Sequence, residues 1–123
     1  IKLSDIGGDL YQIDMCIKSL NSCSYDRNHI LFLAKKPIAV LNNKGCTTLI
    51  CDFDAVGSTG ARLNEYKYST ESSSSIYTPE SGITQLAGDI MSIKFDSQGV
   101  HSVRLQVTDV YGYISTTEIE MNL

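Results

Sequence analysis

The four cysteines carry the most reactive side chains in this sequence of 123 residues. Cys16 and Cys23 are separated by six residues, and Cys46 and Cys51 by four. These spacings, together with two histidines remote from both pairs, favour disulfide bonds over a zinc site. Disulfides persist in oxidising compartments. The cysteines therefore predict a secreted or cell-surface protein, with the periplasm as an alternative.

Four cysteines allow three pairings, and the sequence alone does not select one. The Ser-Leu-Asn-Ser segment between Cys16 and Cys23 can turn the chain, which favours this pair. A straight strand would hold the Cα atoms of Cys46 and Cys51 about 16 Å apart, too far for a disulfide. A Cys46–Cys51 bridge therefore requires a bend near Gly45. Otherwise one of these two cysteines reaches the N-terminal segment or stays free.

The remaining polar residues match no catalytic motif. Val56–Gly60 lacks the second glycine of a nucleophile elbow, and no Gly-Lys-Ser/Thr follows it to form a phosphate loop. His29 and His101 have no motif partner, and we expect His101 to be a satisfied, partly buried imidazole. Two pairs of carboxylates stand two positions apart, Asp52 with Asp54 and Glu118 with Glu120. A glycosidase could use such a pair, but alternation with apolar residues explains them as solvent-facing positions. The chain is therefore not expected to be an enzyme by itself.

Three tyrosines stand near expected loops or strand edges: Tyr77, Tyr111 and Tyr113. Exposed aromatic rings give contact area for proteins or sugars at a low entropic cost. These three are therefore the candidate binding residues, and the alternative is that they are ordinary surface tyrosines. Tyr66 and Tyr68 are instead expected in the core.

The elements that would position these residues are strands. Within Gly99–Gly112, the residues Val103, Leu105 and Val107 alternate with polar residues. This is the pattern of a strand with one buried face. A second alternating run, Tyr113–Met121, follows a short turn that contains Asp and Gly. The two runs together predict a β-hairpin.

Further short strands are indicated by alternation and by turns rich in Gly, Asn and Ser. We expect strands at Pro37–Leu41, Thr47–Asp54, Leu63–Tyr68 and Ile90–Phe95, and short edge strands at Ile76–Tyr77 and Ile83–Leu86. A turn is expected at Asn42–Gly45. About seven strands with a turn roughly every 8–12 residues indicate an all-β chain folded as a β-sandwich.

Residues 1–35 differ from the rest of the chain. Leu10–Ile17 has a rough strand pattern and Ile30–Ala34 is apolar, while helix remains an alternative for parts of the segment. We expect residues 1–35 to be an N-terminal extension or the end of a preceding domain, with a disulfide hairpin as one form. Residues 36–123 are then the sandwich domain.

Residues 37–121 resemble the PKD (polycystic kidney disease) domain, an immunoglobulin-like β-sandwich. Four blocks occur in the order of that family. Lys36–Val40 resembles its first strand, Phe53–Ser58 its Phe-Asp-Ala-Ser-Gly-Ser signature, Leu63–Tyr68 its Ile-x-x-Tyr-x-Trp strand, and Phe95–Gly112 its strand that ends in Val-Thr-Asp-x-x-Gly. Tyr68 stands where the family usually has Trp, and His101 where it usually has Tyr. The resemblance implies a non-catalytic module of a secreted or cell-surface multidomain protein. Such a module spaces domains, binds protein or carbohydrate, or assists a neighbouring hydrolase.

The sequence departs from the family after Tyr68, where Ser69–Ser73 replaces an Asp-Phe-Gly-Asp-Gly segment. Some relatives bind calcium through carboxylates in these loops, and only Asp54 and Asp109 stand at matching positions here. Calcium takes about six to eight oxygen ligands, so the resemblance implies weak calcium candidates and no other cofactor. The alternative is that both carboxylates accept hydrogen bonds from turn amides.

The charge and hydropathy of the chain limit its partners. A net charge of −4 argues against nucleic-acid binding. No apolar run approaches the roughly 20 residues that span a bilayer, so we expect no membrane insertion. The expected partners are an extracellular protein or polysaccharide, or neighbouring domains of the same chain.

A second hypothesis is a structural or adhesin subunit domain that assembles with neighbouring domains or subunits. Three structural features would discriminate between the hypotheses. An exposed aromatic patch would favour binding, and an unpaired long edge strand near residues 10–17 would favour assembly. A deep polar pocket around His101 would favour an enzyme.

Overall fold

The computed structural model describes residues 2–16, 29–71, 74–77 and 86–123, which form strands, turns and loops but no helix. The strands are β1 (Lys2–Asp5), β2 (Leu10–Cys16), β3 (His29–Lys35), β4 (Asn42–Thr47), β5 (Ile50–Asp54), β6 (Leu63–Ser69), β7 (Ser74–Tyr77), β8 (Met91–Phe95), β9 (Val100–Asp109) and β10 (Ile114–Asn122). The prediction of an all-β chain is confirmed. The described ranges hold no helix with the length and apolar character needed to cross a membrane.

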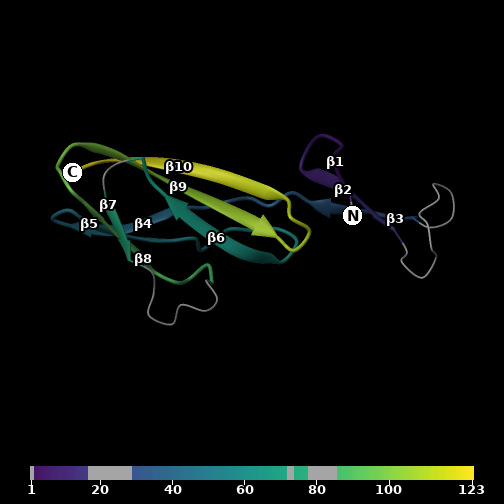
Figure 1. Ribbon diagram of the computed structural model, residues 1–123, viewed down its shortest axis with the longest axis horizontal. Helices are drawn as coiled ribbons and strands as arrows, with labels where there is room; N and C mark the ends of the chain where they lie inside the picture. The colour runs from purple at the N-terminus through teal and green to yellow at the C-terminus, as the bar shows by residue number, and fades with distance from the viewer. Residues whose placement is uncertain (1, 17–28, 72–73, 78–85) are drawn as a thin grey trace.

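The strands form three antiparallel sheets, ordered β1-β2-β3, β10-β9-β6 and β4-β5-β8-β7. The two sheets built from β4 to β10 share one hydrophobic core, and we call this pair of sheets the sandwich. The β1-β2-β3 sheet, here the N-terminal sheet, lies at the end of the sandwich where β9 turns into β10 (Figure 1).

The core of the sandwich is built from alternating residues of facing strands. Val103, Leu105 and Val107 on β9 are fully buried, as predicted. Phe53 on β5 and Phe95 on β8 belong to the same core and are also fully buried. Burial of an apolar side chain of this size stabilises a fold by about 1.5–3 kcal/mol. These residues therefore hold the two sheets against each other.

β9 and β10 form the predicted hairpin, with Ile114 opposite Thr108. The turn is closed by two backbone hydrogen bonds. The amide of Asp109 donates to the carbonyl of Tyr113, and the amide of Gly112 to the carbonyl of Asp109, each at 3.0 Å. Gly112 has a φ of 90°, a conformation that glycine adopts without the steric cost of a side chain.

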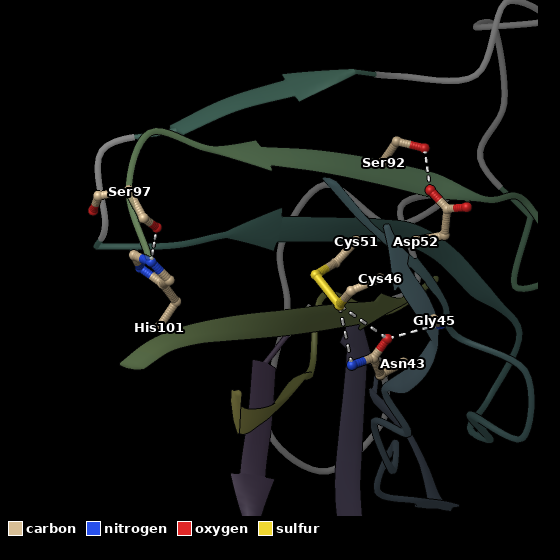
Figure 2. The surroundings of a disulfide bond; sticks show 8 residues. All are labelled: Asn43, Gly45, Cys46, Cys51, Asp52, Ser92, Ser97 and His101. Atoms are coloured by element: carbon tan, nitrogen blue, oxygen red, sulfur yellow. Dashed lines mark hydrogen bonds between the residues drawn. A yellow bond between two sulfur atoms is a disulfide. The ribbon is translucent and has the colours of Figure 1, made fainter. Parts of the chain in front are cut away.

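The single strand expected at Thr47–Asp54 is wrong, because the chain turns at Thr48, which has a φ of 58°. β4 and β5 therefore pair as a hairpin on either side of this turn. Cys46 and Cys51 stand opposite each other and form a disulfide, with their Cα atoms 4.0 Å apart (Figure 2). The bend that this disulfide needs lies between the cysteines and not at Gly45, where the register of β4 shifts.

The expected Asn42–Gly45 turn and Pro37–Leu41 strand are also wrong. Asn42–Gly45 belongs to β4, and within Pro37–Leu41 only Ile38 makes an isolated β-bridge. The physical reason is that the Ser58 side chain, and not a neighbouring strand, bonds the backbone of Val40. The Ser58 hydroxyl accepts a hydrogen bond from the amide of Val40 at 2.8 Å and donates one to its carbonyl at 3.2 Å.

The other strand predictions for the sandwich agree with the structure where it is described. The strands expected at Leu63–Tyr68 and Ile90–Phe95 are confirmed as β6 and β8, and the Ile76–Tyr77 backbone lies in β7. The edge strand expected at Ile83–Leu86 falls outside the described residues, apart from Leu86, which belongs to no strand.

The described parts of residues 1–35 form three strands, with a turn at residues 6–9 between β1 and β2, so the helix alternative is not observed there. β2 is the central strand of the N-terminal sheet: Tyr11 stands opposite Asp5 of β1, and Ile13 opposite Phe32 of β3. β2 is therefore not the edge strand that we considered near residues 10–17, and the outer strands are β1 and β3. The Cys16–Cys23 pairing lies outside the described residues, and the domain boundary after residue 35 stays a prediction.

One buried polar atom of the core lacks a partner. The Tyr68 hydroxyl makes no hydrogen bond with any described residue, and the side chain is 8% exposed. Burial, reinforced by the negative charge of Asp54, raises the pKa of this phenol. The group is therefore neutral, but its lost hydration is not replaced.

Removal of this hydroxyl should stabilise the protein. A buried polar group without a partner costs about 1–3 kcal/mol, so we expect Tyr68→Phe to raise the free energy of unfolding by about 1 kcal/mol in urea denaturation. Tyr66→Phe is the control, since the half-buried Tyr66 lies on the same strand, and its effect should stay below about 0.5 kcal/mol. A loss of stability in Tyr68→Phe would contradict this interpretation.

Candidate functional site

A buried carboxylate lies at the turn between β9 and β10. Asp109 is the last residue of β9 and is 1% exposed. Its Oδ1 accepts hydrogen bonds from the backbone amides of Tyr111 and Tyr113, each at 2.9 Å. Its Oδ2 accepts a hydrogen bond from the hydroxyl of Tyr11 on β2. One carboxylate therefore contacts both the hairpin turn and the N-terminal sheet.

The alternation of β9 places Asp109 in this position. Its side chain continues the buried series of Val103, Leu105 and Val107, so the carboxylate is removed from solvent. A buried carboxylate is costly unless hydrogen-bond donors replace its water. The turn amides are local donors of the kind that Asp commonly uses, while Tyr11 comes from a distant part of the chain.

Aromatic contacts extend the joint between the two parts. The ring of Tyr113 stacks on Tyr11, with centroids 4.4 Å apart and an interplanar angle of 18°. The ring of Tyr111 meets Phe32 of β3 edge to face, with centroids 5.5 Å apart. Tyr11 and Ile13 are fully buried. One face of the N-terminal sheet therefore packs on the tip of the β9–β10 hairpin.

A surface ion pair connects the start of the sandwich segment to the β1–β2 turn. Lys36 Nζ donates to Asp5 Oδ1 at 2.8 Å and to the Gly8 carbonyl at 2.9 Å. This hydrogen bond lowers the pKa of Asp5 and raises the pKa of Lys36. The Tyr113 hydroxyl also donates to Asp5 Oδ2, at 3.3 Å. Because the Asp5 carboxylate at the centre of these contacts is solvent-exposed, we assign them a minor share of the stability.

The hydrogen bonds around Asp109 suit a structural role better than catalysis. Burial and the bond to Asp109 raise the pKa of Tyr11, so the phenol remains a neutral donor near pH 7. Both oxygens of the carboxylate already accept hydrogen bonds from the protein. The geometry therefore describes a fixed joint between the N-terminal sheet and the sandwich.

The structure engages two of the three candidate binding tyrosines in this joint. Tyr111 and Tyr113 are half-buried and contact the N-terminal sheet. The side chain of Tyr77 lies outside the described residues. Tyr11 was not singled out as a functional residue from the sequence. The alternation of β2 could indicate only that Tyr11 faces inward. It could not indicate the hydrogen bond to Asp109, which is 98 positions away.

Asp54, the other weak calcium candidate, is 5% exposed and ends β5. Its Oδ1 accepts hydrogen bonds from the Asn42 side-chain amide at 2.8 Å and from the Val56 backbone amide at 3.2 Å. Lys44 Nζ lies 3.8 Å from its Oδ2. Asp54 and Asp109 thus both accept hydrogen bonds from turn amides. This agrees with the alternative to calcium binding that the sequence offered for both carboxylates. Across the described part of the chain, no three His, Cys, Asp or Glu side chains gather as a metal site.

His101 is packed into the sandwich. Its ring is 7% exposed and stacks on Phe95, with centroids 4.5 Å apart. Its Nε2 donates to the carbonyl of Ser97 at 2.7 Å (Figure 2). The imidazole is therefore buried and hydrogen-bonded, as expected. The side chain of His29 lies outside the described residues.

The carboxylate pairs considered for acid–base chemistry are separated by their environments. Asp52 accepts a hydrogen bond from the Ser92 hydroxyl at 2.6 Å (Figure 2), whereas Asp54 is buried. The solvent-facing assignment was therefore wrong for Asp54, because its carboxylate turns towards loop amides. Glu118 forms an exposed ion pair with Arg104 at 3.1 Å. Glu120 is exposed on the same strand.

A shallow polar hollow of about 130 Å³ lies on the outer surface of the β10-β9-β6 sheet. Its lining residues are Ser69, Thr70, Glu71, Ser102, Arg104 and Glu118. Several polar groups of this lining already bond one another. Arg104 pairs with Glu118, and Thr70 Oγ1 donates a hydrogen bond to the Ser102 carbonyl at 2.6 Å. The sequence did not indicate this hollow, because its residues are the ordinary outward positions of strands and a connecting loop.

No family model matches this chain, and neither a curated protein nor a solved structure matches it significantly. The assignment of function therefore depends on the geometry and on the sequence blocks described above.

The hydrogen bond from Tyr11 to Asp109 should be a large contribution to stability. A buried hydrogen bond to a charged group contributes about 1.5–3 kcal/mol, so Tyr11→Phe should lower the free energy of unfolding by that amount. Tyr113→Phe is the matched control, because the Tyr113 hydroxyl donates to the exposed carboxylate of Asp5. Its effect in the same urea titration should be much smaller than that of Tyr11→Phe, because solvent screens an exposed contact. Equal effects of the two variants would contradict the assignment.

The same variant should show a specific pH dependence. The folded state raises the pKa of Tyr11, so the unfolded chain releases this proton first as the pH rises. The stabilisation is complete below the unfolded pKa of about 10 and decreases above it. The difference in unfolding free energy between wild type and Tyr11→Phe should therefore shrink from about pH 7 to about pH 11. A difference that grows over this range would contradict the sign of the shift.

Proposed function

We propose that this chain is a non-catalytic, PKD-like immunoglobulin-type module of a secreted or cell-surface multidomain protein. Its main role in this proposal is that of a rigid spacer between neighbouring domains. The observation that carries the proposal is the joint at Asp109, which engages Tyr11, Tyr111 and Tyr113 within the chain. Tyr111 and Tyr113, two of the three tyrosines considered for ligand binding, thus serve an internal contact.

The placement of the sequence blocks supports the PKD-like assignment. Leu63–Tyr68 lies in β6 and pairs with β9, which holds most of the Gly99–Gly112 block. Phe53–Ser58 runs from β5 of the opposite sheet into the following loop. Three separate blocks thus meet across one core. The Cys46–Cys51 disulfide is compatible with an oxidising, extracellular location.

The arrangement of the two ends supports a spacer. Leu123 exchanges backbone hydrogen bonds with Gly99, at 2.8 and 3.0 Å, which ties the last described residue to the start of β9. The N-terminal sheet lies at the other end of β9, beside Asp109 (Figure 1). Domains joined to the two ends would be held apart by the length of the sandwich, and loops would carry any contact with protein or polysaccharide.

The spacer role requires that the N-terminal sheet and the sandwich move as one body. We expect ¹⁵N relaxation to give one rotational correlation time for both parts of the wild-type chain. Tyr113→Ala removes the ring that stacks on Tyr11, so it should lower the order parameters of the β1–β3 amides and leave those of β8 unchanged. Independent tumbling of the N-terminal sheet in the wild type would overturn the proposal.

A further inference from the structure

β3 presents an apolar outer edge on the N-terminal sheet. Ile30–Ala34 is an unbroken apolar run, and within the described residues β3 pairs only with β2. Ile30, Leu31 and Leu33 are 51%, 60% and 57% exposed. An outer strand also presents a row of backbone amide and carbonyl groups that can pair with another strand. Both features describe a surface suited to strand addition.

Three other outer strands of this chain, β4, β6 and β10, carry features that usually prevent strand addition. β4 has a register shift and Lys44, and β6 has a register shift and Lys67. β10 carries Glu118 and Glu120 on its exposed face. Charges and bulges of this kind discourage edge-to-edge pairing. By contrast, β3 has no charge, proline or register shift within Ile30–Ala34.

We propose that β3 is a self-association site, at which two copies of this chain pair their β3 strands in antiparallel orientation. The twofold axis passes beside Phe32, and the two N-terminal sheets become one six-stranded sheet. This inference goes beyond the spacer function and does not depend on it. The partner is a second copy because the strand is complementary to itself.

The self-complementarity appears when the two strands are aligned about Phe32. Leu31 of each copy then stands opposite Leu33 of the other, and Ile30 opposite Ala34. Every opposed pair within the apolar run is thus apolar, and residues directly opposite in antiparallel strands contact each other. The exposed leucines of the two copies form one patch of four on the same face of the sheet.

The surroundings of this patch resemble the rim of an interface. Leu31 stands opposite Asp14 of β2, and Leu33 opposite Gln12. Because opposite residues share a face of the sheet, a polar residue flanks the leucine patch on each side. Lys2 of β1 stands opposite Asp14 and continues the polar margin. An apolar centre with a polar margin is the usual anatomy of a protein interface.

The direction of the chain places the two sandwich connections apart. β3 ends at Lys35 and leads through Lys36 into the sandwich. In an antiparallel pair, the two β3 strands run in opposite directions, so the two Lys36 connections leave the shared sheet at opposite ends. The twofold pairing also uses both apolar edges, so it closes at two copies instead of growing into a filament.

Sedimentation equilibrium of the full chain over a range of concentrations tests the proposal. The wild type should form a dimer. Leu31→Lys combined with Leu33→Lys places like charges at the centre, and should weaken the dimer by on the order of 100-fold or more. Val100→Lys combined with Ile114→Lys is the matched control, because these sandwich residues are 63% and 51% exposed. A monomeric wild type, or equal weakening by the control pair, would overturn the proposal.

Cysteine crosslinking tests the register. Opposite Cα atoms of an antiparallel pair lie roughly 4.5–5.5 Å apart, within the range that a disulfide spans. A mixture of Leu31→Cys chains with Leu33→Cys chains should therefore form a covalent dimer under mild oxidation, identified by peptide mapping. Either variant alone should not crosslink through its new cysteine. No crosslink in the mixture, or a Leu31→Cys dimer formed alone, would contradict the pairing.

Discussion

The hydrogen bonds to the Asp109 carboxylate are the constraint on which the arrangement of this chain depends. The alternation of β9 buries the carboxylate, and a buried charge must be surrounded by donors. Two donors are backbone amides of the hairpin turn, and the third is the hydroxyl of Tyr11 in the N-terminal sheet. The same residue thus ends a strand, shapes a turn and fixes a second sheet in place.

The other interactions act around this point. The apolar faces of β5, β8 and β9 form the core of the sandwich, while the Cys46–Cys51 disulfide closes the β4–β5 hairpin. At the joint, Tyr113 stacks on Tyr11 and Tyr111 meets Phe32 edge to face. Together these contacts hold the N-terminal sheet against the sandwich. Among the described residues β3 pairs only with β2, and in the proposed dimer its other edge would join two copies of this chain.

Local pattern predicted the elements that have one buried face. The series Val103, Leu105 and Val107 indicated β9 because side-chain alternation follows directly from strand geometry. The turn at Thr48 could not be predicted, because the propensity of a β-branched residue does not indicate a positive φ. The contact of Tyr11 with Asp109 could not be predicted either, since the two residues are 98 positions apart and only the folded topology brings them together.

Native-state hydrogen exchange of Asp109→Ala against wild type tests the central role of this carboxylate most directly. The account predicts faster exchange at the Tyr111 and Tyr113 amides, which lose their acceptor, and along β2, whose Tyr11 hydroxyl loses the same carboxylate. The β8 amides in the core should keep their protection and report that the sandwich remains folded. Faster exchange in the turn with unchanged protection in β2 would show that the N-terminal sheet does not depend on Asp109, and would contradict the account.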